Sequence, residues 1–336
     1  GEPSPTRAEA VEVALAAGQG MFQAPRMIEA AATDAVTGSV HWAPAKSLWI
    51  GAMTAVALLF GPFAATPGAV ALFVGTTAVT VCLGHSLGMH RRLIHRAYDA
   101  PLWLERLFVY LGTLVGMGGP FGMIRQHDIR DWAQRKPACH PYLSHGSSMA
   151  RDYWWQNHCE LRLAAPPELV IEPRVAADPF YRLIDRTQRW QQLPWALLLY
   201  AVGGWPFVVW GIAARVAASV TGHWLVGYVA HNGGHRSWHV EGSGVQGYNV
   251  PYCGFVTMGE AYHNNHHAFP GSARLAHVDG EIDPGWYVLK GLAALGAVDN
   301  LKLPGTLPER RALVPLSAEA AAITRGTAGG PASESR

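Results

Sequence analysis

The sequence predicts an all-α membrane protein, in which four transmembrane helices form two hairpins beneath a cytoplasmic cap rich in histidine. Three observations predict this fold. Only 15% of the 336 residues are charged, against about 25% in ordinary soluble domains. Four apolar runs approach the roughly 20 residues with which a helix crosses a bilayer. The chain also has 13 tryptophans, a residue type that gathers at membrane interfaces.

The four apolar runs lie in two pairs, which predicts the two hairpins. Uncharged residues around Pro67 separate the first pair, and Arg215 alone is charged between the second. Lysine and arginine concentrate in the middle segment and the C-terminal part, so the positive-inside rule places both, and both termini, on the cytoplasmic side. The runs are Leu48–Ala65, Gly68–Met89, Leu193–Ala213 and Val216–Ala230.

The predicted domains are an N-terminal cytoplasmic segment (1–46), a membrane domain (47–310) and a disordered C-terminal tail (311–336). In the N-terminal segment, Gly1–Asp34 predicts an amphipathic helix or no structure. It has no basic, apolar leader, which favours a bacterial inner membrane. We expect Leu102–Ile124 to lie along the cytoplasmic surface rather than to cross a fifth time. Trp286–Leu295 reads as a short amphipathic helix capped by Asp283.

Composition excludes several classes of protein. The net charge of +2 gives no electrostatic case for nucleic acid as a partner. The apolar fraction of 49% excludes a disordered chain. None of the four cysteines forms a C-x-x-C pair, so we expect neither a zinc ribbon nor a disulfide framework.

The histidines gather near the predicted cytoplasmic ends of the crossings. The strongest pattern is His263, His266 and His267, because positions i, i+3 and i+4 share one face of a helix. Three imidazoles on one face can reach one metal ion or bridge two. The other grouped histidines are His85, His90, His95, His127, His140, His231 and His235.

The remaining spacings leave alternatives open. His90 and His95 are five residues apart, about 140° around an ideal α-helix, so one of them is expected where the helix unwinds. Asp131 lies four residues after His127 and is either an oxygen ligand, a partner that orients a liganding histidine, or an ion-pair partner of a nearby arginine. His231 and His235 are also four apart, but two glycines between them predict that the helix ends there.

Imidazole suits iron, zinc and copper. A zinc site needs only three or four ligands, and cysteine is absent from the histidine groups. Eight or more histidines with one or two carboxylates are too many for one zinc ion and suit a pair of metals. The sequence therefore predicts a non-haem di-iron centre that activates O2 beside a membrane.

Taken in their order along the chain, the apolar hairpins and the histidine motifs resemble those of the membrane-bound fatty acid desaturases. The resemblance is to their acyl-CoA desaturase branch in particular. Similarity extends from about Ser47 to Pro304, and its most specific part is Gly-Glu-x-x-His-Asn-x-His-His-x-Phe-Pro. The matching stretches are Gly84–Arg96, Ala230–Arg236 and Met258–Pro270, with Asp283–Lys290 and Asp299–Lys302 resembling the family's end.

The resemblance implies two irons and a metal-ligand set. By motif position the ligands are His90, His95, His127, His231, His263, His266 and His267. Two departures stand out. The second box, H-x-x-H-H in the family, reads His127-Asp128-Ile129-Arg130-Asp131 here, so two of its histidines are missing. Gly227 also replaces an asparagine of the acyl-CoA branch. We expect Asp131 and His235 to complete the site, with His85 and His140 as further candidates.

The implied reaction is O2-dependent insertion of a double bond into a fatty acyl chain, carried as acyl-CoA or as an acyl lipid. A hydroxylase of lipids or alkanes would use the same boxes and is the alternative. A metal transporter is disfavoured because only His85 and His223 are ionisable inside the crossings. The chain has neither a haem-binding His-Pro-Gly-Gly stretch nor a G-x-G-x-x-G motif. Electrons are therefore expected from a separate ferredoxin or cytochrome b5 with its reductase.

Overall fold

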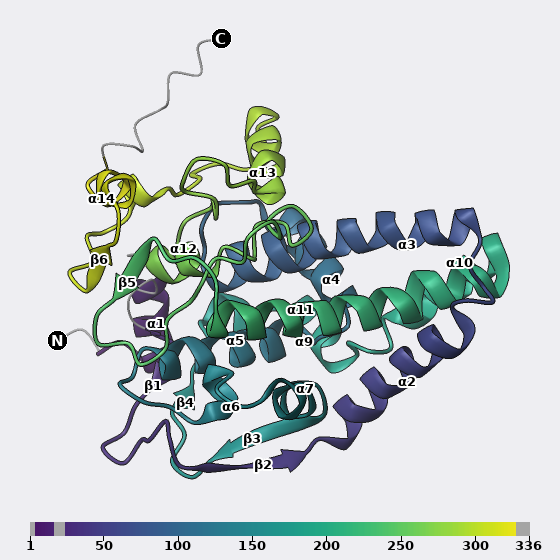
Figure 1. The fold of residues 1–336 in the computed structure, drawn as a ribbon, viewed down its shortest axis with the longest axis horizontal. Helices are drawn as coiled ribbons and strands as arrows, with labels where there is room; N and C mark the ends of the chain where they lie inside the picture. Colours follow the sequence, from purple (N-terminus) through teal and green to yellow (C-terminus); the bar gives the residue numbers. More distant parts are fainter. Residues whose placement is uncertain (1–3, 17–23, 327–336) are drawn as a thin grey trace.

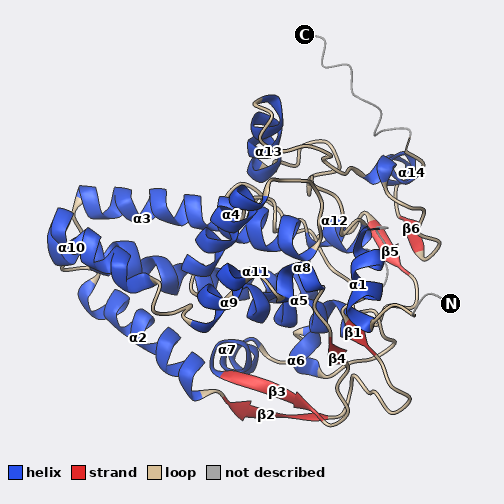
Figure 2. Ribbon diagram, turned by 180° about the vertical axis from the view of Figure 1, so that it is seen from behind, coloured by secondary structure: helices blue, strands red, loops and turns tan. Residues whose placement is uncertain are grey.

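The computed structural model describes residues 4–16 and 24–326. Long helices extend to one side as a lobe, and the remaining short helices, strands and loops gather at the other end (Figure 1). Three small antiparallel sheets pair β1 (Met27–Ile28) with β4 (Glu168–Leu169), β2 (Gly38–Trp42) with β3 (Cys159–Leu163), and β5 (Trp238–Val240) with β6 (Leu313–Pro315). Figure 2 shows all six strands away from the far end of the lobe. The fold is mostly helical, as predicted.

The first helical hairpin joins α2 (Pro44–Phe60) to α3 (Pro67–Val79). Pro67 starts α3, and the Thr66 hydroxyl caps it by accepting a hydrogen bond from the Ala69 amide at 3.1 Å. The helix then continues without a break as η2 (Thr80–Ile94), a π-helix. The second predicted run therefore extends five residues beyond Met89, to Ile94.

The second hairpin consists of α10 (Gln192–Val208), the π-helical η3 (Val209–Ala214) and α11 (Arg215–Asn232). The chain turns at Gly204, whose backbone has φ 70° and ψ −161°, and Pro206 follows two residues later. After this turn the chain runs back toward the start of α10, so that the Arg215 guanidinium lies 2.6 Å from the Gln192 side-chain oxygen. The predicted turn at Arg215 is therefore wrong. The glycine adopts a conformation that few other residues reach, and Arg215 is buried inside a helix.

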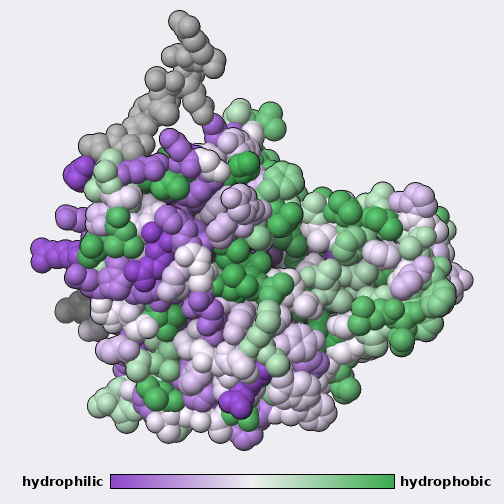
Figure 3. All heavy atoms as spheres, viewed as in Figure 1, coloured by the Kyte–Doolittle hydropathy of each residue, from purple (hydrophilic) through white to green (hydrophobic). Residues whose placement is uncertain are grey.

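The lobe has an apolar surface. Green, hydrophobic residues cover much of the part formed by α2, α3 and α10 (Figure 3), and Phe63, Val202 and Trp205 are exposed there. Pro67–Ile94 and Gln192–Asn232 are long and apolar enough to cross a membrane, whereas α2 is apolar but shorter. A contiguous apolar surface of this kind marks membrane association.

The predicted surface segment Leu102–Ile124 forms two helices, α4 (Leu102–Leu114) and α5 (Pro120–Gln134), so it makes no fifth continuous crossing. Helix α4 packs against η2 with backbone touching backbone. A Cβ atom on Gly84 would lie 2.3 Å from the Gly112 nitrogen, and one on Gly88 would lie 2.6 Å from the Phe108 carbonyl. Glycine is required at this contact because any side chain would separate the helices.

Two buried arginines tie the cap to the end of η2. The Arg26 guanidinium contacts Glu172 at 2.8 Å and Asp128 at 3.0 Å, so it joins the segment before β1 to α5. Arg91, on η2 itself, donates to both carboxylate oxygens of Asp283 at 2.8 and 2.9 Å. Buried charges of this kind are stable only when paired, so these contacts fix the position of η2.

The rest of the cap consists of short elements. They are α1 (Arg7–Ala16), α6 (Pro141–Ser144), α7 (Met149–His158), α8 (Pro173–Ala176), α9 (Pro179–Arg186), α12 (His263–Ala268), α13 (Pro284–Ala294), η4 (Pro304–Thr306) and α14 (Ala318–Thr324). Asp283 caps α13 as predicted, accepting from the Trp286 amide at 3.1 Å. All four cysteines lie within the described ranges, and each is free in the structure.

The prediction of a disordered tail is wrong for its first part. Strand β6 pairs with β5, and α14 buries Ala320 and Ile323 against Trp238. Ser317 caps α14 through its hydroxyl. These few apolar contacts order a segment whose composition is otherwise typical of disorder. The predicted tail beyond Gly326 lies outside the described residues.

Candidate metal centre

Seven of the predicted ligands meet in two groups. The first histidine group is His90, His95, His127 and His266, and the second is His231, His263 and His267. In the first, the Nε2 atoms of His90 and His266 are 3.2 Å apart, as are those of His95 and His127. In the second, His263 Nε2 lies 3.1 Å from that of His231 and 3.0 Å from that of His267.

The π-helix explains how His90 and His95 come together. The His95 amide donates to the His90 carbonyl at 3.1 Å, an i→i+5 bond. The two rings then lie one turn apart on the same side, with centroids 4.9 Å apart. The expectation that one of them lies where the helix unwinds is confirmed, because η2 ends at Ile94 and His95 is its C-cap. The angle of about 140° between them does not hold, because it assumed the 3.6 residues per turn of an α-helix.

The short helix α12 connects the two groups. His263 and His267 face the second group and His266 the first, so the helical spacing predicted from the sequence serves both. The two asparagines between the histidines fix the helix. Asn264 accepts from the Ser237 and Trp238 amides, and Asn265 accepts from the Asn249 side chain at 2.9 Å.

Oxygen atoms hold the outer nitrogen of several rings. Nδ1 of His90 lies 2.9 Å from Glu260 Oε2, and Nδ1 of His127 lies 3.0 Å from Asp128 Oδ1. Nδ1 of His231 lies 2.6 Å from the Gly227 carbonyl oxygen. An oxygen at Nδ1 keeps the proton there and leaves the Nε2 lone pair for a metal ion.

The charge state of the centre suits metal binding. Burial lowers the pKa of His95, His263 and His266 well below the usual value, and lowers that of His267 to about 4. These imidazoles are therefore neutral, which is the form that binds metal. Burial tends to raise the pKa of Glu260, but neighbouring His90 and Arg91 hold it well below its ordinary value. Neutral rings whose Nε2 atoms face one another fit two metal ions.

Two other predicted ligands, Asp131 and His235, lie outside both groups. Asp131 pairs with Arg135 on its own helix at 2.9 Å, which is one of the alternatives considered. Helix α11 ends at Asn232, as the glycines predicted. The His235 backbone pairs with Asn249 beyond that end, and its ring contacts the Ser237 hydroxyl at 3.3 Å.

The two further candidate ligands, His85 and His140, also lie outside both histidine groups. His85 packs edge-on against His223, with ring centroids 4.9 Å apart. His140 precedes α6 and caps it, because its Nδ1 accepts from the Tyr142 amide at 3.1 Å. Its ring lies beside Trp155. Neither histidine belongs to a metal-binding group among the described residues.

Two residues of the centre were missed by the sequence reasoning. Glu260 contacts His90, and its place three residues before His263 in the last motif is the signal that could have found it. His145 stacks on His231 with centroids 4.9 Å apart. It follows α6, far along the chain from the members of the second group, so no spacing pointed to it.

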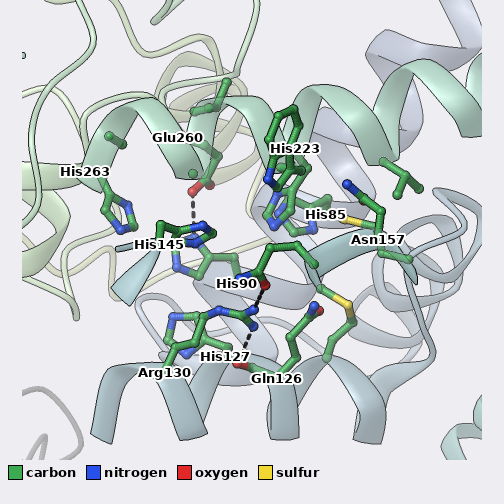
Figure 4. A pocket seen from close by; sticks show the side chains of 18 of the residues that line it. His85, His90, Gln126, His127, Arg130, His145, Asn157, His223, Glu260 and His263 are labelled. Carbon is green, nitrogen blue, oxygen red and sulfur yellow. Dashed lines mark hydrogen bonds and ion pairs between the residues drawn. The ribbon is translucent and has the colours of Figure 1, made fainter. Parts of the chain in front are cut away.

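A pocket opens beside both groups (Figure 4). Its walls come from α2, η2, α5, α7, α11 and α12. Apolar side chains include Ile50, Met123 and Val220, while Lys46, Asn157 and Arg189 add polar and charged atoms. Figure 4 shows His85, His223 and Asn157 on one side of the pocket and His263 on the other.

An apolar helical lobe, with a pocket that reaches buried histidine groups, defines an enzyme that acts on an apolar chain. The chain belongs to the fatty acid desaturase family, whose sequence model matches residues 65–277. It is therefore an oxidoreductase, an O2-dependent fatty acyl desaturase.

Several relatives support this assignment. The palmitoyl-monogalactosyldiacylglycerol delta-7 desaturase of Arabidopsis thaliana is 33% identical over 75% of this chain and 67% of its own length. The sn-1 stearoyl-lipid 9-desaturase of Anabaena variabilis is 34% identical over 67% of this chain and 80% of its own. The acyl-CoA C20 Delta5-desaturase of Anemone leveillei is 31% identical over 70% and 74%.

Proposed function

We propose that this desaturase is a di-iron enzyme that uses the two histidine groups as its metal positions. The observation that carries the proposal is that α12 contributes ligands to both groups at the wall of one pocket. The seven imidazoles are divided four and three, so each ion would have a nitrogen-rich position. Such a position suits non-haem iron.

The overall reaction removes two hydrogens from adjacent methylene groups. A saturated segment, O2, two electrons and two protons give an alkene and two waters. Iron, when bound, would supply the O2 activation and hydrogen abstraction that no side chain can perform. The protein holds the rings through Glu260, Asp128 and the Gly227 carbonyl, and the buried pocket excludes water from the reacting carbons.

The substrate in this proposal is a fatty acyl chain attached to a polar carrier, either CoA or a lipid. The apolar part of the pocket, including Ile50, Met123 and Val220, would contact the chain. Lys46 and Arg189 line the same pocket and offer positive charge to a carrier. Such a division between apolar walls and a few polar groups is typical of ligand sites.

In the membrane, we propose that the two hairpins make four crossings and that the cap lies on the cytoplasmic side, in a bacterial inner membrane. The apolar surface of the lobe supports the proposal that the two hairpins are inserted in the membrane (Figure 3). An external ferredoxin or cytochrome b5 with its reductase would deliver electrons at the cap. The charge distribution of the loops supports this orientation.

Product analysis tests the proposal. The protein is expressed with iron supplementation in cells that lack their own desaturase, and total fatty acids are analysed by mass spectrometry. We expect new double bonds with the wild type and none with His266→Ala, while His140→Asn retains activity because asparagine still caps α6. Hydroxylated chains without alkenes would overturn the proposed reaction and favour the hydroxylase. Separate assays with acyl-CoA and with acyl lipid distinguish the two carriers.

A further inference from the structure

We propose that His145 supplies the nitrogen that completes the second metal position, and that Asp152 holds it there. This inference rests on the proposed dinuclear centre. The second histidine group has three members where the first has four. His145 stands beside one of the three, stacked on His231 with ring centroids 4.9 Å apart and the planes 22° apart, and it lines the same pocket.

The Nδ1 atom of His145 is fixed by a carboxylate. It lies 2.8 Å from Asp152 Oδ2, and Asp152 is fully buried. The same oxygen accepts from the Trp224 indole at 3.0 Å, and the other oxygen accepts from the Gln156 amide at 3.1 Å. With both oxygens engaged as acceptors, the proton resides on His145 Nδ1, and the Nε2 lone pair is available for a metal ion.

The His145 ring packs against α11, the helix that carries His231. A Cβ atom on Gly227, one turn before His231, would lie 3.7 Å from His145 Nε2 and 3.8 Å from its Cε1, which are ordinary contact distances. The edge of the ring that carries Nε2 therefore lies beside the helix that supplies His231 to the second group.

The backbone around His145 is also built to hold the ring. His145 has φ 54°, in the left-handed region, although it is not glycine. The Asn232 side chain, at the end of α11, donates to its carbonyl at 3.0 Å. Such a conformation is unfavourable for a residue other than glycine and persists where the surroundings impose it, often at functional sites.

The same arrangement occurs twice in the first group. His90 lies against Glu260 and His127 against Asp128, each through Nδ1. In both cases the opposite nitrogen faces the other histidines of the group. His145 with Asp152 is a third carboxylate–histidine pair, and it is the one beside the second group. With His145 included, each position has four histidines.

Anaerobic titration of metal-free protein in detergent with 57Fe(II), followed by Mössbauer spectroscopy, tests the inference. The wild type is expected to bind two irons with distinct signals. His145→Ala should retain the first signal and lose or weaken the second by at least about 10-fold in affinity. Asp152→Asn keeps the ring but loses its orienting carboxylate, and should weaken the second iron by roughly 10–100-fold. His140→Asn, on the same segment, should match the wild type.

Added imidazole provides a readout that does not depend on activity. It should restore the second signal in His145→Ala, because it can occupy the space of the missing ring. Two irons with unchanged affinity and signals in His145→Ala would overturn the role of His145 while leaving the dinuclear centre intact. Loss of both irons without rescue by imidazole would also overturn it. A wild type that binds fewer than two irons would instead contradict the proposed centre itself.

Discussion

At the scale of single residues, position in space matters more than spacing in the sequence. His231 and His235 are four residues apart, yet only His231 lies in a metal-binding group. We predict that His231→Ala lowers desaturation and second-site iron binding by about 100-fold or more, because it removes a ligand. His235→Ala should leave both within about threefold of the wild type. Equal losses in the two variants would contradict the site described above.

Glu281 makes the stability of the cap depend on pH. Burial raises the pKa of Glu281 to about 7, despite hydrogen bonds from the Val278 amide and the Asn265 side chain. The folded protein therefore binds this proton more tightly than the unfolded chain, whose value is 4.5. Stability is present below pH 4.5 and is lost as the pH rises toward 7, by up to about 3 kcal/mol.

Thermal melting in detergent between pH 5 and pH 8 tests this linkage. We expect the midpoint to fall across this range in the wild type and to fall less in Glu281→Gln, which cannot ionise. The comparison of slopes removes the contribution of the other groups that titrate in this pH range. Parallel slopes in the two proteins would mean that Glu281 titrates as an ordinary exposed carboxylate.

The residues that form the candidate metal centre were partly predictable from the sequence. Seven ligand candidates followed from motif position, and the structure brings all seven into the two groups. His145 could not be predicted, because its partner Asp152 lies on α7 and its neighbour His231 on α11. Only the fold brings these segments together. Asp131 was a reasonable candidate by spacing, but Arg135 pairs with it one turn further along α5.

At the scale of elements, the contact between η2 and α4 sets the position of the first histidine group. We predict that Gly88→Ala costs about 1–3 kcal/mol of stability through overpacking, and that it lowers iron binding at the first group. A methyl group there would lie 2.6 Å from the Phe108 backbone. Gly75→Ala on the same long helix, where nothing lies within 4 Å, is the matched control. Melting curves and iron content measure both effects.

If Gly88→Ala melted and bound iron as Gly75→Ala does, the backbone contact would not position the histidines. The first hairpin was predictable, because its apolar runs and the charge-free turn before Pro67 are local features. The π-helical register of η2 and the corner of the second hairpin at Gly204 were not. Both depend on packing partners, such as Leu114, whose carbonyl accepts from Arg215 at 2.5 Å.

At the scale of the whole molecule, the apolar lobe and the more hydrophilic cap lie at opposite ends (Figure 3). We predict opposite accessibility for the corner of the first hairpin and for α1. In a background with the native cysteines replaced, Phe63→Cys should react with an impermeant maleimide only from outside the cell. Arg7→Cys should react only in inverted vesicles. Labelling of both from the same side would contradict the proposed topology.

The mostly helical fold and its apolar segments were predicted from composition and charge, whereas the packing inside the cap was not. Its order comes from long-range pairs such as Arg91 with Asp283 and Arg26 with Glu172. Strand β6 and α14 became ordered by packing on Trp238, although the tail's composition suggested otherwise. Pairings between distant segments leave no periodic signal in a sequence, so only the structure reveals them.

The iron content of the purified protein tests the central claim most directly. We predict two irons per chain for the wild type after iron-supplemented expression, measured by mass spectrometry of the metal against protein concentration. His266→Ala should hold one or fewer, because α12 then contributes no ligand to the first group. One iron or none in a folded, iron-supplied wild type would contradict the dinuclear centre.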